Sequence, residues 1–461
     1  MSDILAFVEN DMYVRNFLSS GALDKLIAHR SMKISAGELV NPDRLQPWSA
    51  ICTKPYKRHL RNVKTVFGFN KLSIRRFRRR SRTFDIKVRT GAPFGRYGLI
   101  ERLRSEPMIY DRFVLPGLLE ELGNNDSLEA VIAQESPRLI LFPITGVEST
   151  GYELIKLSRR YDFRTLFLIN GWDNLSSKTV FGALPDYMGL WGPQALNDAE
   201  RIHGLSRERG VLLGCARYEP YFGDRATSES PFPFRYALFA GATTACDELT
   251  PLRLLDEELT RSGVEDLRVV YRPHPWRESR VCDDLFEAKN FKHTILDPQL
   301  QDAYYSNKRS KQESVSSKTM PSLGYYPKLL NHASLVISPM SSMTLEAALF
   351  NVPTIILAHD DGIHKIPGSL QAQYQHFDGG REVIGWHFVD DLGRLPSTLM
   401  KVYELTRQDT PSKRHFAPSL ARSMEPYILM DERSYAERLL DATDAIMDRA
   451  KGRDHRAHSH A

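Results

Sequence analysis

The chain has 461 residues, of which 42% are hydrophobic and 26% are charged. These values exclude a wholly disordered chain and indicate roughly two to three globular domains. The net charge is only +5, yet residues 51–100 hold 15 Lys or Arg and a single acid, Asp85, so this segment carries +14 and the rest of the chain −9. A local basic field of this size is expected to attract an anionic partner.

Four cysteines are too few and too scattered for a disulfide framework or a zinc ribbon, and we expect reduced thiols in a cytosolic protein. They are Cys52, Cys215, Cys246 and Cys282. The opening MSDILAFVEN has no basic segment before its short apolar run, unlike a signal peptide. No stretch approaches the ~18 apolar residues that span a bilayer. The sequence therefore predicts a cytoplasmic protein, at most peripheral to the inner face of a membrane.

Short apolar runs alternate with helical patterns along the chain. A strand and a helix open it within residues 4–28, and basic, helix-compatible residues follow to about 135. The remaining predicted strands are 138–142, 165–169, 187–191, 211–214, 236–241, 267–271, 293–297, 333–338 and 353–357. The clearest predicted helices are 152–161, 193–204, 247–263, 342–350 and about 432–450.

This alternation predicts two α/β halves, each a parallel sheet with helices on both faces, joined by a Pro-, Ser- and Gly-rich linker at 219–234. The expected divisions are a first domain at 1–220 with a basic helical insertion at about 50–125, a second domain at 235–425, a closing helix at 426–450 and a disordered tail at 451–461. Ligands of such sheets bind at the carboxyl ends of strands, and in a two-domain protein in the cleft between the halves. Polar residues that directly follow strands are therefore the candidates.

The string YRPHP follows the predicted strand 267–271. Its two prolines fix the turn, which leaves Arg272 and His274 at a strand end. Arg donates two parallel hydrogen bonds to a phosphate, and His donates one hydrogen bond or a proton. The alternative is a structural turn with a solvated Arg.

The string SPMSSMTLEAALF runs from a strand end into a helix, and its first turn holds Ser341, Ser342 and Thr344. Helix N-terminal amides with hydroxyls form an anion site without a metal, and Glu346 one turn later suits a ribose hydroxyl. Plain helix capping explains one serine, and less readily the whole set. The string FAGATT adds Gly241 and Thr243 after another strand of the same half, where small residues let a backbone approach a ligand.

In the first half, Asp173 in the loop GWDNLSSK is a candidate general base or sugar ligand, and equally a helix cap. Glu148 after strand 138–142, and Glu9 and Asp11 near the end of the first strand, are weaker candidates of the same kind. For His203, near a helix end, we expect a structural role.

The pairing of the RPHP loop with a later SS-x-x-x-EA helix start resembles the second domain of GT-B nucleotide-sugar glycosyltransferases. The resemblance is closest to the CDP-glycerol glycerophosphotransferase and bacterial surface-polysaccharide transferase group, and the strings WDNLSSK and PDYMGLWGPQALNDAERIHG fit it too. It covers about 1–28 and 138–450, whereas 50–125 matches no family pattern.

This resemblance implies two Rossmann-like domains facing across a cleft, with the last helix crossing back to the first domain. It implies a nucleotide-activated sugar or polyol-phosphate donor held by the second domain, a glycan or lipid-linked acceptor at the first, and no metal. The donor's phosphates and ribose would contact Arg272, His274, Ser341, Ser342 and Glu346. The string EAALFNVP lacks a second Glu, which departs from the paired-glutamate pattern of a retaining mechanism. The residues do not choose between uridine and cytidine.

The string IRRFRRRSRTF at 74–84 permits contact with an anionic acceptor or membrane surface, nucleic-acid binding, or a solvated face paired with acids. No nucleic-acid motif accompanies it, so no nucleic-acid partner is expected. The residues proposed for the anionic contact are Arg75, Arg76, Arg78, Arg79 and Arg80.

The leading functional interpretation is a glycosyltransferase of cell-envelope polysaccharide biosynthesis, in which Asp173 or Glu148 is the base and His274 a donor ligand or acid–base group. The alternatives are an isomerase similar to UDP-N-acetylhexosamine 2-epimerases, which shares the architecture, and a non-catalytic scaffold of the same shape.

Overall fold

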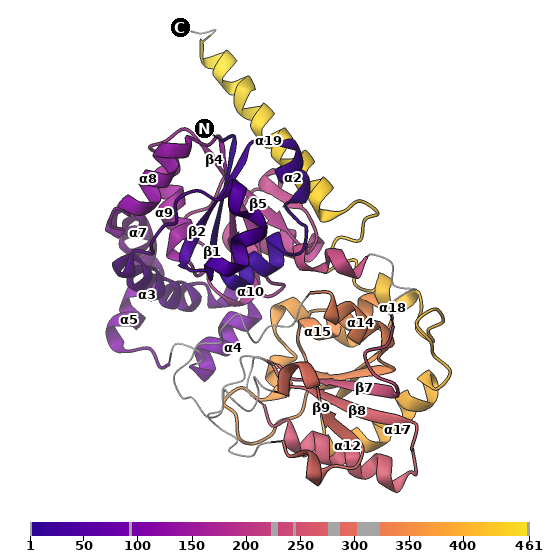
Figure 1. The fold of residues 1–461 in the computed structure, drawn as a ribbon. Helices are drawn as coiled ribbons and strands as arrows, with labels where there is room; N and C mark the ends of the chain where they lie inside the picture. Colours follow the sequence, from indigo (N-terminus) through magenta and orange to yellow (C-terminus); the bar gives the residue numbers. More distant parts are fainter. Residues whose placement is uncertain are drawn as a thin grey trace. The chain divides into compact units, whose positions relative to one another are not determined.

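The computed structural model describes residues 2–91, 95–222, 229–242, 246–274, 286–301 and 323–458. The chain forms two compact units. Unit 1 comprises Met1–Glu219 together with Pro426–Ala461, and unit 2 comprises Pro220–Glu425 (Figure 1). The described cysteines Cys52, Cys215 and Cys246 are free thiols, and Cys282 lies outside the described residues.

Unit 1 is built on a six-stranded parallel sheet in the order β2-β1-β3-β4-β5-β6. Phe7 of β1 packs in one apolar cluster, and its neighbours Ala6 and Val8 pack in another, because successive strand residues point to opposite faces. Both faces of the sheet are therefore buried. The strands are Ile4–Asn10 (β1), Met32–Leu39 (β2), Leu139–Ile144 (β3), Arg164–Ile169 (β4), Tyr187–Leu190 (β5) and Gly210–Leu212 (β6).

Helices supply the apolar side chains on both faces of this sheet. One cluster draws on Leu60–Arg76 (α3), Arg82–Thr90 (α4), Leu115–Glu121 (α7), Asp126–Glu135 (α8), Ser149–Ser158 (α9) and Pro193–His203 (α11). The other draws on Asp24–His29 (α2) and Tyr435–His458 (α19). Short helices complete the unit at Asp11–Tyr13 (α1), Leu99–Arg104 (α5), Pro107–Ile109 (α6) and Asn174–Ser177 (α10).

Unit 2 repeats the design with the order β12-β11-β10-β7-β8-β9, again all parallel. Its strands are Arg235–Ala240 (β7), Leu267–Arg272 (β8), Thr294–Leu296 (β9), Leu335–Pro339 (β10), Thr354–Leu357 (β11) and Trp386–Val389 (β12). Figure 1 shows Leu249–Arg261 (α12) and Leu395–Thr406 (α17) on one face, and Tyr325–His332 (α14), Ser342–Leu349 (α15) and Ser419–Arg422 (α18) on the other. A short helix, Gly368–Gln371 (α16), follows β11.

Each sheet has one place where the strand order reverses. The chain moves outward in one direction from β1 and in the other from β3, and likewise from β7 and β10. In open parallel sheets ligands bind outside the carboxyl ends of the strands at this switch point. The loops after β1 and β3 in unit 1, and after β7 and β10 in unit 2, are therefore the places where a site is expected.

The C-terminal helix differs from the sequence-based expectation at both ends. It begins at Tyr435, three residues after the predicted start near 432, because Ser434 and Glu437 form a reciprocal cap: the Ser434 amide donates to the Glu437 carboxylate, and the Glu437 amide donates to the Ser434 hydroxyl. It continues to His458, into residues that we expected to belong to a disordered tail. Its residues Tyr435 and Leu439 pack against the sheet of unit 1, which confirms the predicted return of the last helix to the first half.

Candidate functional site

The start of α15 lies at the switch point of unit 2, directly after β10. Ser341 is the N-cap, and its Oγ accepts a hydrogen bond of 3.3 Å from the Met343 amide. Ser341 and Ser342 are both partly exposed, as is the first turn up to Met343. Because the helix dipole and the first-turn amides favour negative charge, this turn can hold an anion such as a phosphate.

The other two members of this motif have internal partners. Thr344 is fully buried, and its hydroxyl donates to the Ser341 carbonyl at 2.7 Å. Glu346 is also buried, and its two carboxylate oxygens accept from the hydroxyls of Ser342 and Tyr221. The structure thus places Thr344 and Glu346 beneath the helix start, where they hold Ser341 and Ser342 in position.

Arg272, the last residue of β8, lies inside unit 2. Only 4% of its surface is exposed, and its Nη1 donates to the fully buried carboxylate of Asp297 in an ion pair. The rings of Tyr325 and Tyr326 flank the guanidinium at 5.4 and 4.6 Å from its central carbon. Although burial opposes its charge, Tyr326 and Asp297 raise the pKa of Arg272 above its usual value. The sequence placed Arg272 at a strand end but gave no sign of Asp297.

The loop after β7 packs tightly against the loop after β8. A side chain at Gly241 would come within 2.7 Å of the Glu248 carboxylate and 2.9 Å of the His274 amide nitrogen, so glycine is needed here for packing inside the unit. Burial and the charge of Arg272 lower the pKa of His274 to about 4, so its ring is neutral near pH 7. Thr243 lies outside the described residues.

Asp361, in the loop after β11, is a polar residue at the same edge that the sequence analysis did not single out. It accepts from the Asp247 amide at 3.0 Å and from His364 Nδ1 at 2.6 Å. Although burial opposes the charge, the amides of His364, Asp247 and Ile363 lower the pKa of Asp361 to about 2. This carboxylate connects the loop after β11 to the residues that precede α12. The string DDG around it is typical of an ordinary turn, so the sequence alone does not indicate this role.

In unit 1, Glu148 organises the turn between β3 and α9. Its carboxylate accepts from the amides of Thr145, Gly146 and Val147 at 3.0–3.1 Å. The hydroxyls of Thr145 and Tyr13 donate to it as well. With five donor groups around it, Glu148 is well explained as a structural carboxylate.

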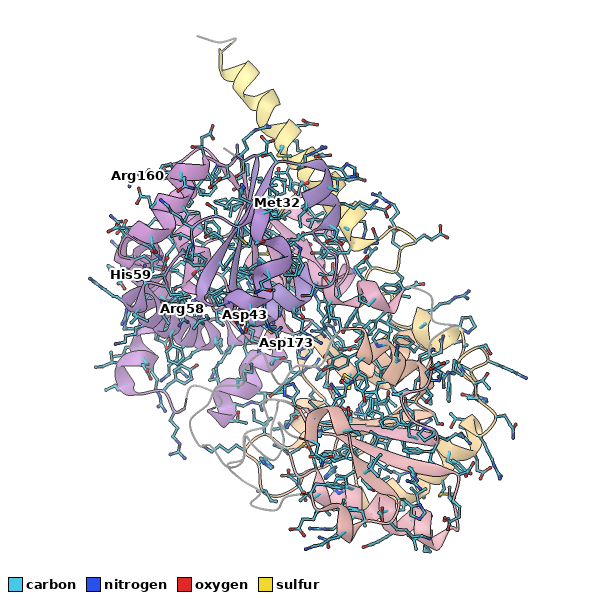
Figure 2. All side chains as sticks on the ribbon, viewed as in Figure 1. Met32, Asp43, Arg58, His59, Arg160 and Asp173 are labelled. Atoms are coloured by element: carbon cyan, nitrogen blue, oxygen red, sulfur yellow. The ribbon has the colours of Figure 1, made fainter. Side chains whose placement is uncertain are left out.

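Asp173 follows β4 and precedes α10, and Figure 2 labels it at the lower end of unit 1. Its carboxylate accepts from the Ser177 hydroxyl at 2.6 Å and from the Asn174 amide group at 3.1 Å, and pairs with Lys178 Nζ at 3.3 Å. Lys87 reaches the same turn by donating to the Ser177 carbonyl, and burial lowers its pKa to about 8. Asp173 is the N-cap residue of α10, where its carboxylate contacts neighbouring side chains and caps no backbone amide, and it remains a predicted base.

Glu9, near the carboxyl end of β1, is the most perturbed carboxylate at the switch point of unit 1. It is 6% exposed, and burial and then the nearby charge of Glu148 raise its pKa to about 7. Its neighbours Tyr56 and Thr150 are fully buried, and the Thr150 hydroxyl lowers the pKa of Glu9 by less than burial and Glu148 raise it. A carboxyl group that titrates near neutral pH suits proton transfer. The sequence predicted that Glu9 lies near a strand end, but it did not predict the burial that raises its pKa.

The remaining polar candidates of unit 1 have structural roles. Asp11 accepts from the Asn41 amide at 2.8 Å. His203 is buried, accepts from the Phe181 amide through Nδ1, and lies 2.7 Å from the Leu175 carbonyl through Nε2, while burial lowers its pKa to about 4. The structural role predicted for His203 is consistent with these contacts.

The basic segment 74–84 is packed more closely than its sequence indicated. Its two aromatic residues, Phe77 and Phe84, belong to the apolar core and are not exposed for stacking or membrane contact. Arg76 pairs with Asp111 at 2.6 Å, and Arg80 donates to the Ile202 carbonyl at 2.8 Å. The guanidinium of Arg75 lies over the ring of Tyr97, whereas Arg78 is partly exposed and Arg79 is exposed. The segment thus agrees in part with the interpretation of a solvated face paired with acids.

Among the described residues, no three His, Cys, Asp or Glu side chains are grouped so as to bind a metal ion. In the same part of the chain, no helix combines the length and the hydropathy of a membrane span.

A scan against protein-family models and a search of curated proteins gave no match. Solved structures do match. The glycosyltransferase of kitacinnamycin is 12% identical with a TM-score of 0.50, over 97% of this chain and 98% of that one. The UDP-N-acetylglucosamine 2-epimerase from Rickettsia bellii is 13% identical with a TM-score of 0.50, over the same shares of the two chains. The chain has the GT-B fold. The predicted fold class is confirmed, and the same fold carries both transferases and epimerases.

Proposed function

We propose that this protein is a glycosyltransferase that moves a sugar, or a polyol phosphate, from a nucleotide-activated donor to a surface-glycan or lipid-linked acceptor. The observation that carries the proposal is the partly exposed first turn of α15, with Ser341 and Ser342, at the switch point of a Rossmann-type sheet. The narrower assignment to the CDP-glycerol glycerophosphotransferase and surface-polysaccharide group rests on the motifs of the sequence.

In this proposal unit 2 binds the donor's diphosphate at α15. The first-turn amides and the Ser341 and Ser342 hydroxyls donate to the phosphate oxygens, and the helix dipole stabilises the charge that grows on the leaving diphosphate. These groups need no metal ion. Glu346 contributes through Ser342, since it accepts the Ser342 hydrogen bond from below. Arg272 and His274 stay predicted donor contacts, with Arg272 also the buried partner of Asp297.

Glu9 is the carboxylate of unit 1 that best suits the general base. It takes the proton of an acceptor hydroxyl, and the oxygen then attacks the anomeric carbon while the bond from that carbon to the diphosphate breaks. A base whose pKa lies near the working pH is the most effective, and the pKa of Glu9 is about 7. Glu148 and Asp173, the bases predicted from sequence, have their oxygens engaged by neighbouring donors.

An epimerase acting on a nucleotide sugar is the second candidate. It is favoured by the equal structural similarity to the Rickettsia bellii 2-epimerase. The two functions differ in one observable: an epimerase converts its nucleotide sugar without any acceptor. Proton NMR of each nucleotide sugar incubated with the purified full chain distinguishes them.

Nucleotide binding gives the first test. A thermal-shift series with UDP, CDP, CMP, GDP, ADP and dTDP, without metal, is expected to show stabilisation by one of them. A ligand at a hundredfold excess over its Kd adds about 2.7 kcal/mol to the free energy of unfolding. Ser341→Ala is expected to weaken that nucleotide's affinity about tenfold, since one hydrogen bond to a charged group is lost. It is also expected to lower stability by about 1 kcal/mol through loss of the N-cap.

Ser397→Ala is the matched control. Ser397 lies in the first turn of another helix of unit 2, α17, and its hydroxyl donates to the Arg394 carbonyl. This variant should keep the full nucleotide shift. If no nucleotide stabilises the protein, the transferase and the epimerase are both excluded. If both serine variants weaken binding equally, α15 is not the phosphate site.

A further inference from the structure

The helical insertion between β2 and β3 exposes apolar side chains that the core does not use. In α5, whose sequence is LIERLR, Leu99 is 75%, Ile100 73% and Leu103 51% exposed. Two more exposed apolar side chains, Met108 and Phe113, follow within ten residues. Five of the fourteen large hydrophobic residues that are exposed in the described part of the chain thus lie between 99 and 113. Such a concentration marks an interaction surface.

Helix α3 extends this surface. Leu60, Lys64, Phe67 and Lys71 follow the i, i+4, i+7, i+11 spacing of one helix face, and Leu60 and Phe67 are 67% and 59% exposed. Lys71 pairs with Glu101 of α5 at 2.6 Å, which joins this face of α3 to α5. Figure 1 shows α5 beside α3 at the periphery of unit 1. We call the exposed side chains of Leu60, Phe67, Leu99, Ile100 and Leu103 the α3–α5 surface.

The charges around this surface are strongly positive. Residues 57–113 hold 17 Lys or Arg and four acids. Three of these acids already pair with bases: Asp85 with Arg89, Glu101 with Lys71, and Asp111 with Arg76. The exposed bases that alternate with the apolar side chains include Arg61, Lys64, Arg102 and Arg104. Apolar side chains interleaved with exposed bases are complementary to the boundary between anionic headgroups and acyl chains.

We infer that the α3–α5 surface docks the protein on an anionic lipid bilayer. Its apolar side chains enter the boundary between headgroups and acyl chains, and its arginines and lysines reach the lipid phosphates. A second copy of the chain would bring two positive surfaces together, which disfavours self-association. This surface differs from the segment 74–84, whose phenylalanines are buried. The inference does not depend on the proposed catalytic activity.

Vesicle sedimentation tests the inference with the full chain. We expect binding to vesicles of phosphatidylglycerol and phosphatidylcholine in equal parts, weaker binding to phosphatidylcholine alone, and loss of the difference at high salt. The double variant Ile100→Ser/Leu103→Ser should partition roughly tenfold less, since two inserted side chains become polar. Arg104→Glu should weaken binding to the anionic vesicles by at least fivefold, since each base near the surface contributes about that factor.

The control is Ile384→Ser, which changes a 63% exposed isoleucine of unit 2 and should bind vesicles as the unchanged protein does. Because all these side chains are exposed, each variant is expected to fold, and its thermal unfolding curve checks this. The inference is overturned if the unchanged protein does not bind anionic vesicles, or if the double variant binds them as well as Ile384→Ser does. It is also overturned if sedimentation equilibrium shows a dimer that the double variant dissociates, because the surface is then an interface between copies.

Discussion

Arg272→Ala is expected to lower the free energy of unfolding by about 3–5 kcal/mol, the loss typical of breaking a buried ion pair from one side. The cause is Asp297, whose side chain is fully buried and would be left charged without its cation. The same carboxylate accepts from the Tyr325 hydroxyl and from the Gln299 amide, so it cannot turn to solvent without breaking those hydrogen bonds. Urea denaturation at neutral pH measures the loss directly.

The double variant Arg272→Met/Asp297→Asn separates stability from nucleotide binding. It removes both charges, while asparagine keeps an oxygen that can accept from the Gln299 amide. Replacing both partners of a buried pair is often nearly neutral, so most of the lost stability should return. If the double variant regains stability but no nucleotide raises its unfolding temperature, Arg272 is a donor contact. If a nucleotide stabilises the double variant as it stabilises the unchanged protein, Arg272 is a structural residue. An unchanged unfolding free energy in Arg272→Ala would contradict the ion-pair interpretation.

Glu9→Gln is expected to lower the transfer rate by about 10²–10⁴-fold, the usual contribution of a general base, and to raise stability at alkaline pH. The folded-state pKa of Glu9 is raised from 4.5 to about 7, so the folded protein binds this proton more tightly than the unfolded chain. That stabilisation is complete below pH 4.5 and is lost as the pH rises through 7. The variant should escape a loss of up to about 3 kcal/mol between pH 5 and 8. Denaturation curves at these two pH values, with a pH–rate profile, provide the measurement.

Glu148→Gln is the informative comparison, because its expected effect on stability has the opposite sign. Glutamine would place an NH₂ group where the amides of Thr145, Gly146 and Val147 now donate, so this variant should be less stable at pH 8. Asp173→Asn tests the base predicted from sequence. If it removes activity while Glu9→Gln keeps it, Asp173 is the base and the assignment of Glu9 is wrong.

Most strands could be predicted because their apolar runs are short and bounded by turn residues, as in RLILF and LRVVY. The two that were missed, β2 and β12, lie at the edges of their sheets. There the sequences MKISAGEL and WHFV mix polar with apolar residues, since an edge strand has only one neighbour. Local patterns therefore predict where the strands lie in the chain. They do not predict the strand order of each sheet, because that order depends on pairings between distant segments.

The residues of the candidate site also differ in whether a local sequence pattern could predict them. Ser341 and Ser342 could be found because a strand end followed by a capped helix is a local pattern. The pairing of Arg272 with Asp297 joins residues 25 positions apart, and no local signal announces it. The pKa of Glu9 depends on burial and on Glu148, which the chain brings close only after folding. Partners of this kind decide whether a polar residue is a ligand contact, a base or a support, and they are set by tertiary structure.

The return of α19 to unit 1 means that the first domain is discontinuous and the second is an insertion within it. A single cut near residue 219 would therefore not release two complete domains. The fragment before the cut would lack Tyr435, Leu439 and Ile446, so the apolar cluster that they share with α2 and β1 would be incomplete. Unit 2, by contrast, is one uninterrupted stretch of chain. The order of synthesis follows from this: the ribosome completes the inserted domain before it supplies the helix on which the core of the first one depends.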